Sequence, residues 1–227
     1  LAVRLRARSV DGGEREQRPG RDLRTCRERR VRCAVMTPEL ASLTEALRTP
    51  APWLEPYTVV ARQVVAAAAS SSVADALNTA RGDSLDGLRF VAQAALPEGE
   101  PYESVIFRTG CIPTRDNLHD LFNGLMWLSY PRAKRRLNLL QAQQLAELGN
   151  AGSRGPLRDA LTIFDENAAI LRAPTPLIEA LRQRDWNGLF LDLRAHWAAA
   201  RLVIFGHALM EKLMQPRKAI TAHVWLV

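Results

Sequence analysis

Histidine and acidic residues recur in the second half of the sequence at spacings that suit a metal ion. His207 and Glu211 are four residues apart, so on a helix they share one face and can reach the same cation. Imidazole and carboxylate are common ligands of zinc and similar divalent metals. A second His–acid pair, His119 and Asp120, falls on another predicted helix. The predicted metal ligands are therefore His119, Asp120, His207 and Glu211.

Two further acids, Asp165 and Glu166, lie at a predicted turn and are the predicted catalytic residues. If these segments converge, imidazoles and carboxylates together can bind a divalent metal with an open position that activates water. Metal-dependent hydrolysis is the function that this set favours. A purely structural explanation stays open, because first-turn acids offset the helix dipole, turns are often acidic, and His–Glu pairs four apart are common at surfaces.

A second candidate site follows Pro131, where cations crowd the first turn of a predicted helix. Cations there oppose the helix dipole, and a bound anion such as phosphate would relieve the conflict. The predicted anion-binding residues are Arg132, Lys134, Arg135, Asn138 and Arg158, with Arg136 and Arg154 as further candidates. This pattern favours the alternative function, a non-enzymatic cytoplasmic binding module for an anionic small molecule. A basic run is also typical of a solvated face.

The basic character of the whole chain does not predict nucleic-acid binding. The formal net charge is +7, but residues 1–35 carry 11 Arg and 5 acidic residues, which leaves +1 for residues 36–227. A nucleic-acid-binding domain needs its excess charge on the folded surface that meets phosphate. The sequence also lacks a Gly-x-Ser-x-Gly elbow and a Gly-rich phosphate loop, and its apolar runs are shorter than the ~20 residues that span a bilayer. Neither nucleic acid nor membrane is an expected partner, and the sequence does not predict an oligomeric state.

Residues 1–35 are expected to lie outside the folded domain. They are a disordered basic arm, an organelle-targeting peptide, or translated sequence upstream of the natural start. The last is favoured, because one Ser and five acids are atypical of a transit peptide. Met36 then precedes a typical helix start, with Thr37 as the predicted N-cap and Pro38 at the first helical position. Residues 36–227 are predicted to form a single globular domain that is truncated within a strand at Val227.

Apolar periodicity predicts the elements that carry these residues. Helices are expected at residues 37–48, 57–69, 73–81, 117–129, 132–148, 175–183, 186–200 and from 206, with Ser72 and Asp116 as N-caps. Short strands or irregular packing segments are expected at 88–92 and 105–107, strands at 201–205 and 219–227, and a hairpin or helix-to-strand corner at 157–171. Trp127, Trp186, Trp197, Phe122 and Phe190 fall at core spacing. The predicted fold class is α+β, a predominantly helical single domain with one small sheet.

Several short motifs, taken in order, resemble a known family. They are Pro113-Thr114-Arg115, His119-Asp120-Leu121-Phe122-Asn123, Trp127, Pro131-Arg132, Lys134, Leu137-Asn138, Arg158-Asp159, Phe164-Asp165-Glu166-Asn167 and Phe205-Gly206-His207-Ala208-Leu209-Met210-Glu211. Together they resemble the bacterial domain of unknown function 3025 over most of residues 36–227. The resemblance implies a bacterial, cytoplasmic protein that continues past Val227, and it implies no activity. A single cysteine within these residues, Cys111, fits a reducing compartment.

Overall fold

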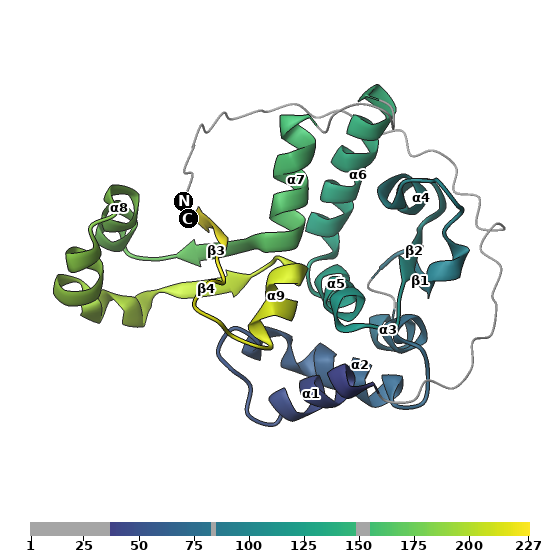
Figure 1. Ribbon diagram of the computed structural model, residues 1–227, viewed down its shortest axis with the longest axis horizontal. Helices are drawn as coiled ribbons and strands as arrows, with labels where there is room; N and C mark the ends of the chain where they lie inside the picture. Colours follow the sequence, from purple (N-terminus) through teal and green to yellow (C-terminus); the bar gives the residue numbers. More distant parts are fainter. Residues whose placement is uncertain (1–36, 83–84, 149–154) are drawn as a thin grey trace.

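The computed structural model describes residues 37–82, 85–148 and 155–227. Helices make up most of this part of the chain, and two small sheets lie at separate places in it (Figure 1). The predicted α+β class is confirmed, but the single predicted sheet is wrong. The predicted separate segment, residues 1–35, and the candidate anion-binding residue Arg154 lie outside the described residues.

The elements follow one another in a mixed order. The helices are α1 (Pro38–Ala46), α2 (Thr58–Ala68), α3 (Val73–Arg81), α4 (Tyr102–Thr109), α5 (Leu118–Ser129), α6 (Pro131–Leu148), α7 (Pro156–Asn167), α8 (Thr175–Gln183) and α9 (His207–Leu213). Shorter helical turns are η1 (Glu55–Tyr57), η2 (Gln93–Ala95), η3 (Gly188–Asp192) and η4 (Arg194–Ala199). The strands are β1 (Arg89–Ala92), β2 (Cys111–Thr114), β3 (Ala168–Arg172), β4 (Arg201–Ile204) and β5 (His223–Leu226).

The N-terminal helices begin where the sequence predicts. Thr37 accepts a hydrogen bond from Leu40 N at 3.3 Å, and Ser72 accepts one from Asp75 N at 3.1 Å. A side-chain oxygen at this position satisfies a backbone N–H that the first turn of a helix leaves without a partner. Both predicted caps are confirmed.

The cap of α5 differs from the prediction. Asn117 accepts the hydrogen bond from Asp120 N, at 2.8 Å, and is the N-cap in place of Asp116. Asp116 instead accepts a hydrogen bond from Val73 N at 2.8 Å, so its carboxylate satisfies the first turn of α3. Two neighbouring residues therefore cap two different helices and fix the start of α5 against α3.

The two sheets are built from strands of different origin. β1 and β2 pair in parallel, with α4 between them in the chain. In the other sheet β3 is the central strand, antiparallel to β4 and parallel to β5. Residues 105–107, predicted as a short strand or irregular packing segment, are part of α4, where Val105 and Ile106 are buried. A short apolar run cannot be assigned to helix or strand by periodicity alone, and here burial of one helical face decides.

The main core lies between α1, α2, α3 and α5. Leu43, Leu77, Leu121 and Leu125 are fully buried there, and burial of each such side chain stabilises the fold by about 1.5–3 kcal/mol. Tyr57 belongs to the same cluster and donates a hydrogen bond to the carbonyl of Ile204 at 2.6 Å, which joins this layer to β4. None of the described helices is both long and apolar enough to cross a lipid bilayer.

Residues 175–199, here called the outer lobe, project beyond β3 and β4 on the left of Figure 1. They pack around a small hydrophobic cluster of their own, formed by Leu177, Ala180 and Leu189. The predicted helix over residues 186–200 is replaced by η3 and η4. Leu189 is buried, but Trp186 and Phe190 are 52% and 61% exposed, so their predicted core positions are wrong. Because η3 has π-helical spacing, the 3.6-residue periodicity used for that prediction does not hold here.

Candidate functional site

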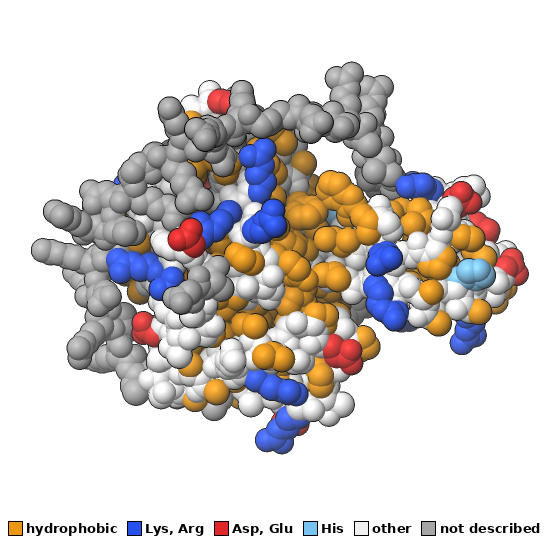
Figure 2. Space-filling model, turned by 180° about the vertical axis from the view of Figure 1, so that it is seen from behind, with side chains coloured by type: hydrophobic (Ala, Val, Ile, Leu, Met, Phe, Trp, Pro, Cys, Tyr) orange, Lys and Arg blue, Asp and Glu red, His pale blue; other side chains and the backbone are white. Residues whose placement is uncertain are grey.

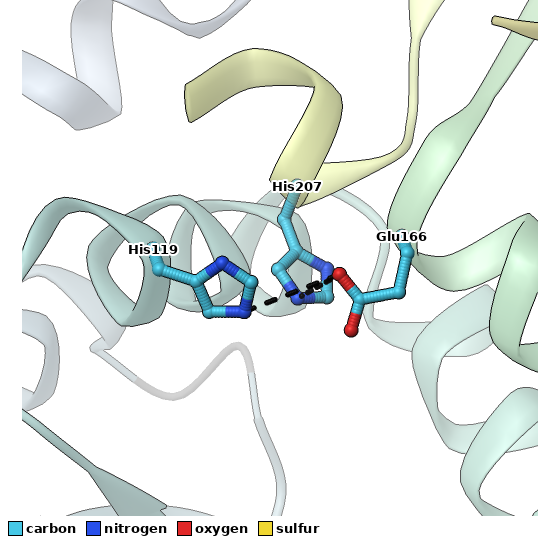
Figure 3. A group of neighbouring side chains, drawn as sticks. All are labelled: His119, Glu166 and His207. Atoms are coloured by element: carbon cyan, nitrogen blue, oxygen red, sulfur yellow. Dashed lines mark ion pairs between the residues drawn. The ribbon is translucent and has the colours of Figure 1, made fainter. Parts of the chain in front are cut away.

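Three helix ends converge on one cluster of side chains. His119 lies in the first turn of α5, Glu166 in the last turn of α7, and His207 at the first position of α9 (Figure 3). One ligand atom from each of the three lies within 4.8 Å of the other two. Tetrahedral ligands at about 2.1 Å from a metal are roughly 3.4 Å apart. The cluster is therefore close to the size of a metal site.

Gly206 allows this convergence. A Cβ atom at residue 206 would lie 2.5 Å from Asn167 N and 2.5 Å from the carbonyl oxygen of Glu166. Real Cβ atoms do not approach backbone this closely, so only glycine lets the start of α9 pack directly against the end of α7. That contact places His207 beside Glu166.

His207 is held in one tautomer. Its Nδ1 lies 2.8 Å from the backbone carbonyl oxygen of Asp165, and since a carbonyl oxygen only accepts, Nδ1 carries the proton. Burial lowers the pKa of His207 to about 3, with the nearby Lys134 ammonium acting in the same direction. The ring is therefore neutral near pH 7, and its Nε2 presents a lone pair.

His119 is oriented in a similar way by a carboxylate. Its Nδ1 lies 3.0 Å from Glu211 Oε2, which leaves Nε2 directed toward Glu166 at 4.0 Å. The two imidazole rings meet edge to face, with centroids 4.7 Å apart. Metal-binding histidines commonly donate their second N–H to a carbonyl or carboxylate, which fixes the ring and its tautomer. Both histidines of the cluster have such a partner.

Glu166 faces the two histidines with an oxygen that can only accept when it is ionised. Its Oε2 lies 3.3 Å from His207 Nε2, which is also an acceptor in the neutral ring. Burial raises the pKa of Glu166, the Asp165 carboxylate adds to this, and His119 opposes it. Two acceptors at this distance repel unless a proton or a cation lies between them. A shared proton or a bound metal is therefore required.

Asp165 is directed away from the histidines and into a buried ion pair. Its carboxylate lies 2.5 Å from Lys134 Nζ, which also donates to Asn123 Oδ1 at 2.8 Å. Asn123 in turn donates to the hydroxyl of Tyr102 at 3.1 Å. Burial alone would raise the pKa of Asp165, but the Lys134 ammonium and the two nearby histidines together hold that pKa below its usual range. These contacts hold Asp165, the residue before Glu166, in place beside the cluster.

A cavity of about 290 Å³ opens beside the cluster. Its wall combines the cluster and Lys134 with apolar side chains such as Leu96 and Ile106, and it continues along α6 past Asn138 to Gln141. Its volume is close to the lower end of small-molecule sites, about 300–1,000 Å³. A cation held by the cluster would face this space.

The structure brings part of the predicted metal set together. His119 and His207 meet, and Glu211 lies against His119 from behind. Asp120 does not join them, because its carboxylate accepts hydrogen bonds from the backbone N and the guanidinium of Arg115. Glu166, predicted as catalytic, takes the position of the third ligand.

The predicted anion-binding set does not come together at one point. Lys134 is 3% exposed and bound to Asp165, Arg135 donates to the carbonyls of Leu85 and Asp86, and Asn138 donates to the carbonyl of Glu103. Lys134 and Asn138 line the cavity described above, whereas Arg132, Arg135 and Arg158 are not part of its wall. Lys134, Arg135 and Asn138 thus each contact a different part of the protein.

The sequence reasoning missed Tyr102 and Gln141, which also line the cavity. A signal for Gln141 was present, because Lys134, Asn138 and Gln141 are spaced four and three residues apart and so form a polar stripe on one face of α6. All of them are buried. No comparable signal marks Tyr102, which comes from the segment that was predicted least well.

Comparison with known proteins gives one match. The model of the family described as "Protein of unknown function (DUF3025)" matches residues 88–227, which include every residue of the cluster. No curated protein and no solved structure is detectably similar to the chain.

Proposed function

The chain belongs to the DUF3025 family, whose name carries no activity, and we propose from its geometry that it is a metal-dependent hydrolase. A divalent metal bound by His119, Glu166 and His207 would keep a position open to the cavity. One observation carries the proposal: Glu166 Oε2 and the lone pair of His207 Nε2 face each other at 3.3 Å. A cation resolves this contact, and two neutral imidazoles with a carboxylate are the ligands of known hydrolytic zinc sites.

The metal would lower the pKa of a bound water and polarise a substrate carbonyl. In this proposal Glu211 and the carbonyl of Asp165 are positioning groups, because each contacts the Nδ1 side of a histidine. Lys134 is the group best placed to stabilise negative charge that develops in the cavity, since it is a buried cation on the cavity wall. Asp165 holds that cation in place and is not assigned the role of a base.

The alternative, a binding module built on the basic start of α6, has less support. It needs several cations that converge on one anion. Lys134 and Arg135, its central residues, have different protein partners, Asp165 for Lys134 and the carbonyl of Leu85 for Arg135. No specific observation favours this function over the hydrolase.

Metal binding to the purified protein tests the proposal. Elemental analysis should find about one divalent metal per chain, and after chelation Zn²⁺ should bind again in a calorimetric titration. At 100 times its Kd, Zn²⁺ should raise Tm by about 5–10 °C. His207→Ala should abolish binding, and Glu211→Gln should weaken it about tenfold, as expected for an outer-shell partner.

His196 offers the matched control, because it is an exposed histidine outside the cluster. His196→Ala should bind Zn²⁺ as the wild type does. Absence of metal in the purified protein, together with no Zn²⁺ binding by the wild type, would falsify the proposal. Equal losses in His196→Ala and His207→Ala would show that any binding is unspecific.

A further inference from the structure

Gln141 is a largely buried polar side chain with no hydrogen-bond partner among the described residues. It is 6% exposed, it lines the cavity, and no described residue forms a hydrogen bond with its amide. The other buried polar residues of the described chain, such as Asn123 and Thr109, have such bonds. Its amide atoms are not among the buried unpaired side-chain atoms of the described residues, so the amide is open to the cavity. A ligand in the cavity is the natural partner of this group.

Asn138 adds a second polar atom on the same face of α6. Its Nδ2 donates to the carbonyl of Glu103 at 2.8 Å, and its Oδ1 accepts from no donor in the described part of the chain. The side chain of Gln141 carries an acceptor and a donor next to each other. Such a pair matches the N–H and C=O of another amide in a two-point contact.

The charges around the cavity favour a neutral ligand. Its two wall cations, Lys134 and Arg115, are each paired with a carboxylate, from Asp165 and Asp120 respectively. Glu103 also lines the cavity and would repel an anion. At the Gln141 end of the cavity, the ligand is therefore recognised by hydrogen bonds and not by an ion pair.

The distance between the two ends limits the size of the ligand. Lys134, next to the cluster, and Gln141 are seven residues apart, which is two turns or roughly 10 Å along α6. One extended residue spans about 3.3–3.6 Å, so a ligand about three residues long reaches from one end to the other.

We propose that the cavity binds a small, neutral, amide-bearing substrate, with one amide paired to Gln141 and Asn138 and the scissile carbonyl at the histidine cluster. The position of the scissile carbonyl at the histidine cluster rests on the proposed hydrolase function. The subsite at Gln141 stands on its own contacts, and so it is testable with and without metal.

N-acetylglycinamide is a suitable probe, and N-acetylglycine is its negatively charged counterpart. Binding should be followed by ligand-detected NMR on the full chain, both after chelation and with Zn²⁺ added. The neutral amide should bind in both states, and in the chelated protein the carboxylate should bind at least about tenfold more weakly, because Glu103 repels it. Gln141→Met should weaken binding of the amide about tenfold or more, since one unpaired hydrogen-bonding group is lost.

Gln143→Met is the matched control, because Gln143 is an exposed glutamine on the same helix. A ligand-binding role predicts that Gln141→Met leaves the Tm of the ligand-free protein within about 2 °C of this control, because no hydrogen bond to a described residue is lost. A purely structural glutamine would instead lower Tm when replaced.

The two proposals fail separately. Lack of Zn²⁺ binding with intact, Gln141-dependent amide binding removes the hydrolase and keeps the subsite. Failure of the neutral amide to bind in either state, equal binding by Gln141→Met, or stronger binding of the carboxylate to the chelated protein overturns the subsite, whatever the metal result.

Discussion

The histidine cluster and the outer lobe depart from an ordinary protein surface in opposite ways. In the cluster, His207 is buried and His119 and Glu166 are partly buried, and each histidine has a partner that fixes its direction, as with His207 and the carbonyl of Asp165. In the outer lobe and the sheet beside it, large apolar side chains are exposed, among them Trp186, Phe190 and Trp225. Figure 2 shows the lobe on the right, with hydrophobic side chains spread over the surface between it and the main body.

The difference lies in what each region says about a ligand. Burying a polar group is unfavourable unless it is paired, so an oriented polar cluster points to a specific chemistry. An exposed apolar surface says only that apolar atoms meet water there. The hollow of about 410 Å³ between Leu181, Trp197 and Leu226 is of this second kind, since nothing in the structure shows what covers it. We therefore assign function to the first region and none to the second.

The largest effect on stability is expected for Lys134→Met, in the ion pair next to the histidine cluster. It leaves the Asp165 carboxylate buried without its cation, which should lower the free energy of unfolding by about 3–5 kcal/mol. Urea denaturation monitored by circular dichroism measures this change. Lys212→Met, at an exposed lysine of α9, is the control and should change stability by less than about 0.5 kcal/mol.

The same pair gives a pH dependence with a definite sign. The pKa of Asp165 is lowered in the folded protein, so its contribution is present above the ordinary carboxyl pKa and is lost as pH falls below about 4. Wild type should therefore lose more stability than Lys134→Met over that acid range. Parallel acid unfolding curves for both proteins would show that the pair contributes little.

Whether a contact could be predicted from the sequence depends on how far apart its residues are along the chain. Local hydrogen bonds were predictable, as for the caps Thr37 and Ser72. His119 and His207 were chosen by residue type, but their approach depends on the contact of Gly206 with the end of α7, to which helical periodicity gives no access. A shared helix face also does not decide where a side chain points. Glu211, four residues after His207, contacts His119 instead.

The predicted role of Glu166 needed the same tertiary information. Sequence placed it at a turn with Asp165, and the two were treated alike. In the structure they differ because Lys134 takes the Asp165 carboxylate and leaves that of Glu166 to the histidines. Trp186 and Phe190 show the converse case, where a correct apolar pattern was read with the wrong helical spacing.

Glu166→Gln sharpens the comparison, because it should act in opposite directions on metal binding and on stability. Zn²⁺ affinity should fall by about 100-fold or more, since loss of even an outer-shell partner lowers affinity 10- to 100-fold. Without metal, the new amide can donate to His207 Nε2 and no buried charge remains, so Tm should rise by about 2–4 °C. Calorimetric titration and thermal unfolding measure the two effects.

Glu179→Gln is the control for this change, since Glu179 is exposed on α8 of the outer lobe. It should alter neither quantity. The pKa of Glu166 is raised, and a metal competes with the proton, so the Zn²⁺ affinity of the wild type should fall as pH drops through that raised pKa. A lower Tm for metal-free Glu166→Gln, with unchanged Zn²⁺ affinity, would contradict the ligand role of Glu166.

The smallest effect is expected in the outer lobe, at Phe190. Its ring is 61% exposed and stacks on Trp186 with centroids 6.5 Å apart, so Phe190→Ser should lower the free energy of unfolding by about 0.5 kcal/mol. Its neighbour Leu189 is fully buried, and Leu189→Ala should cost about 2–5 kcal/mol. Urea denaturation of both variants compares an exposed with a buried position of one segment. If Phe190→Ser is as destabilising as Leu189→Ala, the apolar face of the lobe is covered in solution, and the contrast between the two regions no longer holds.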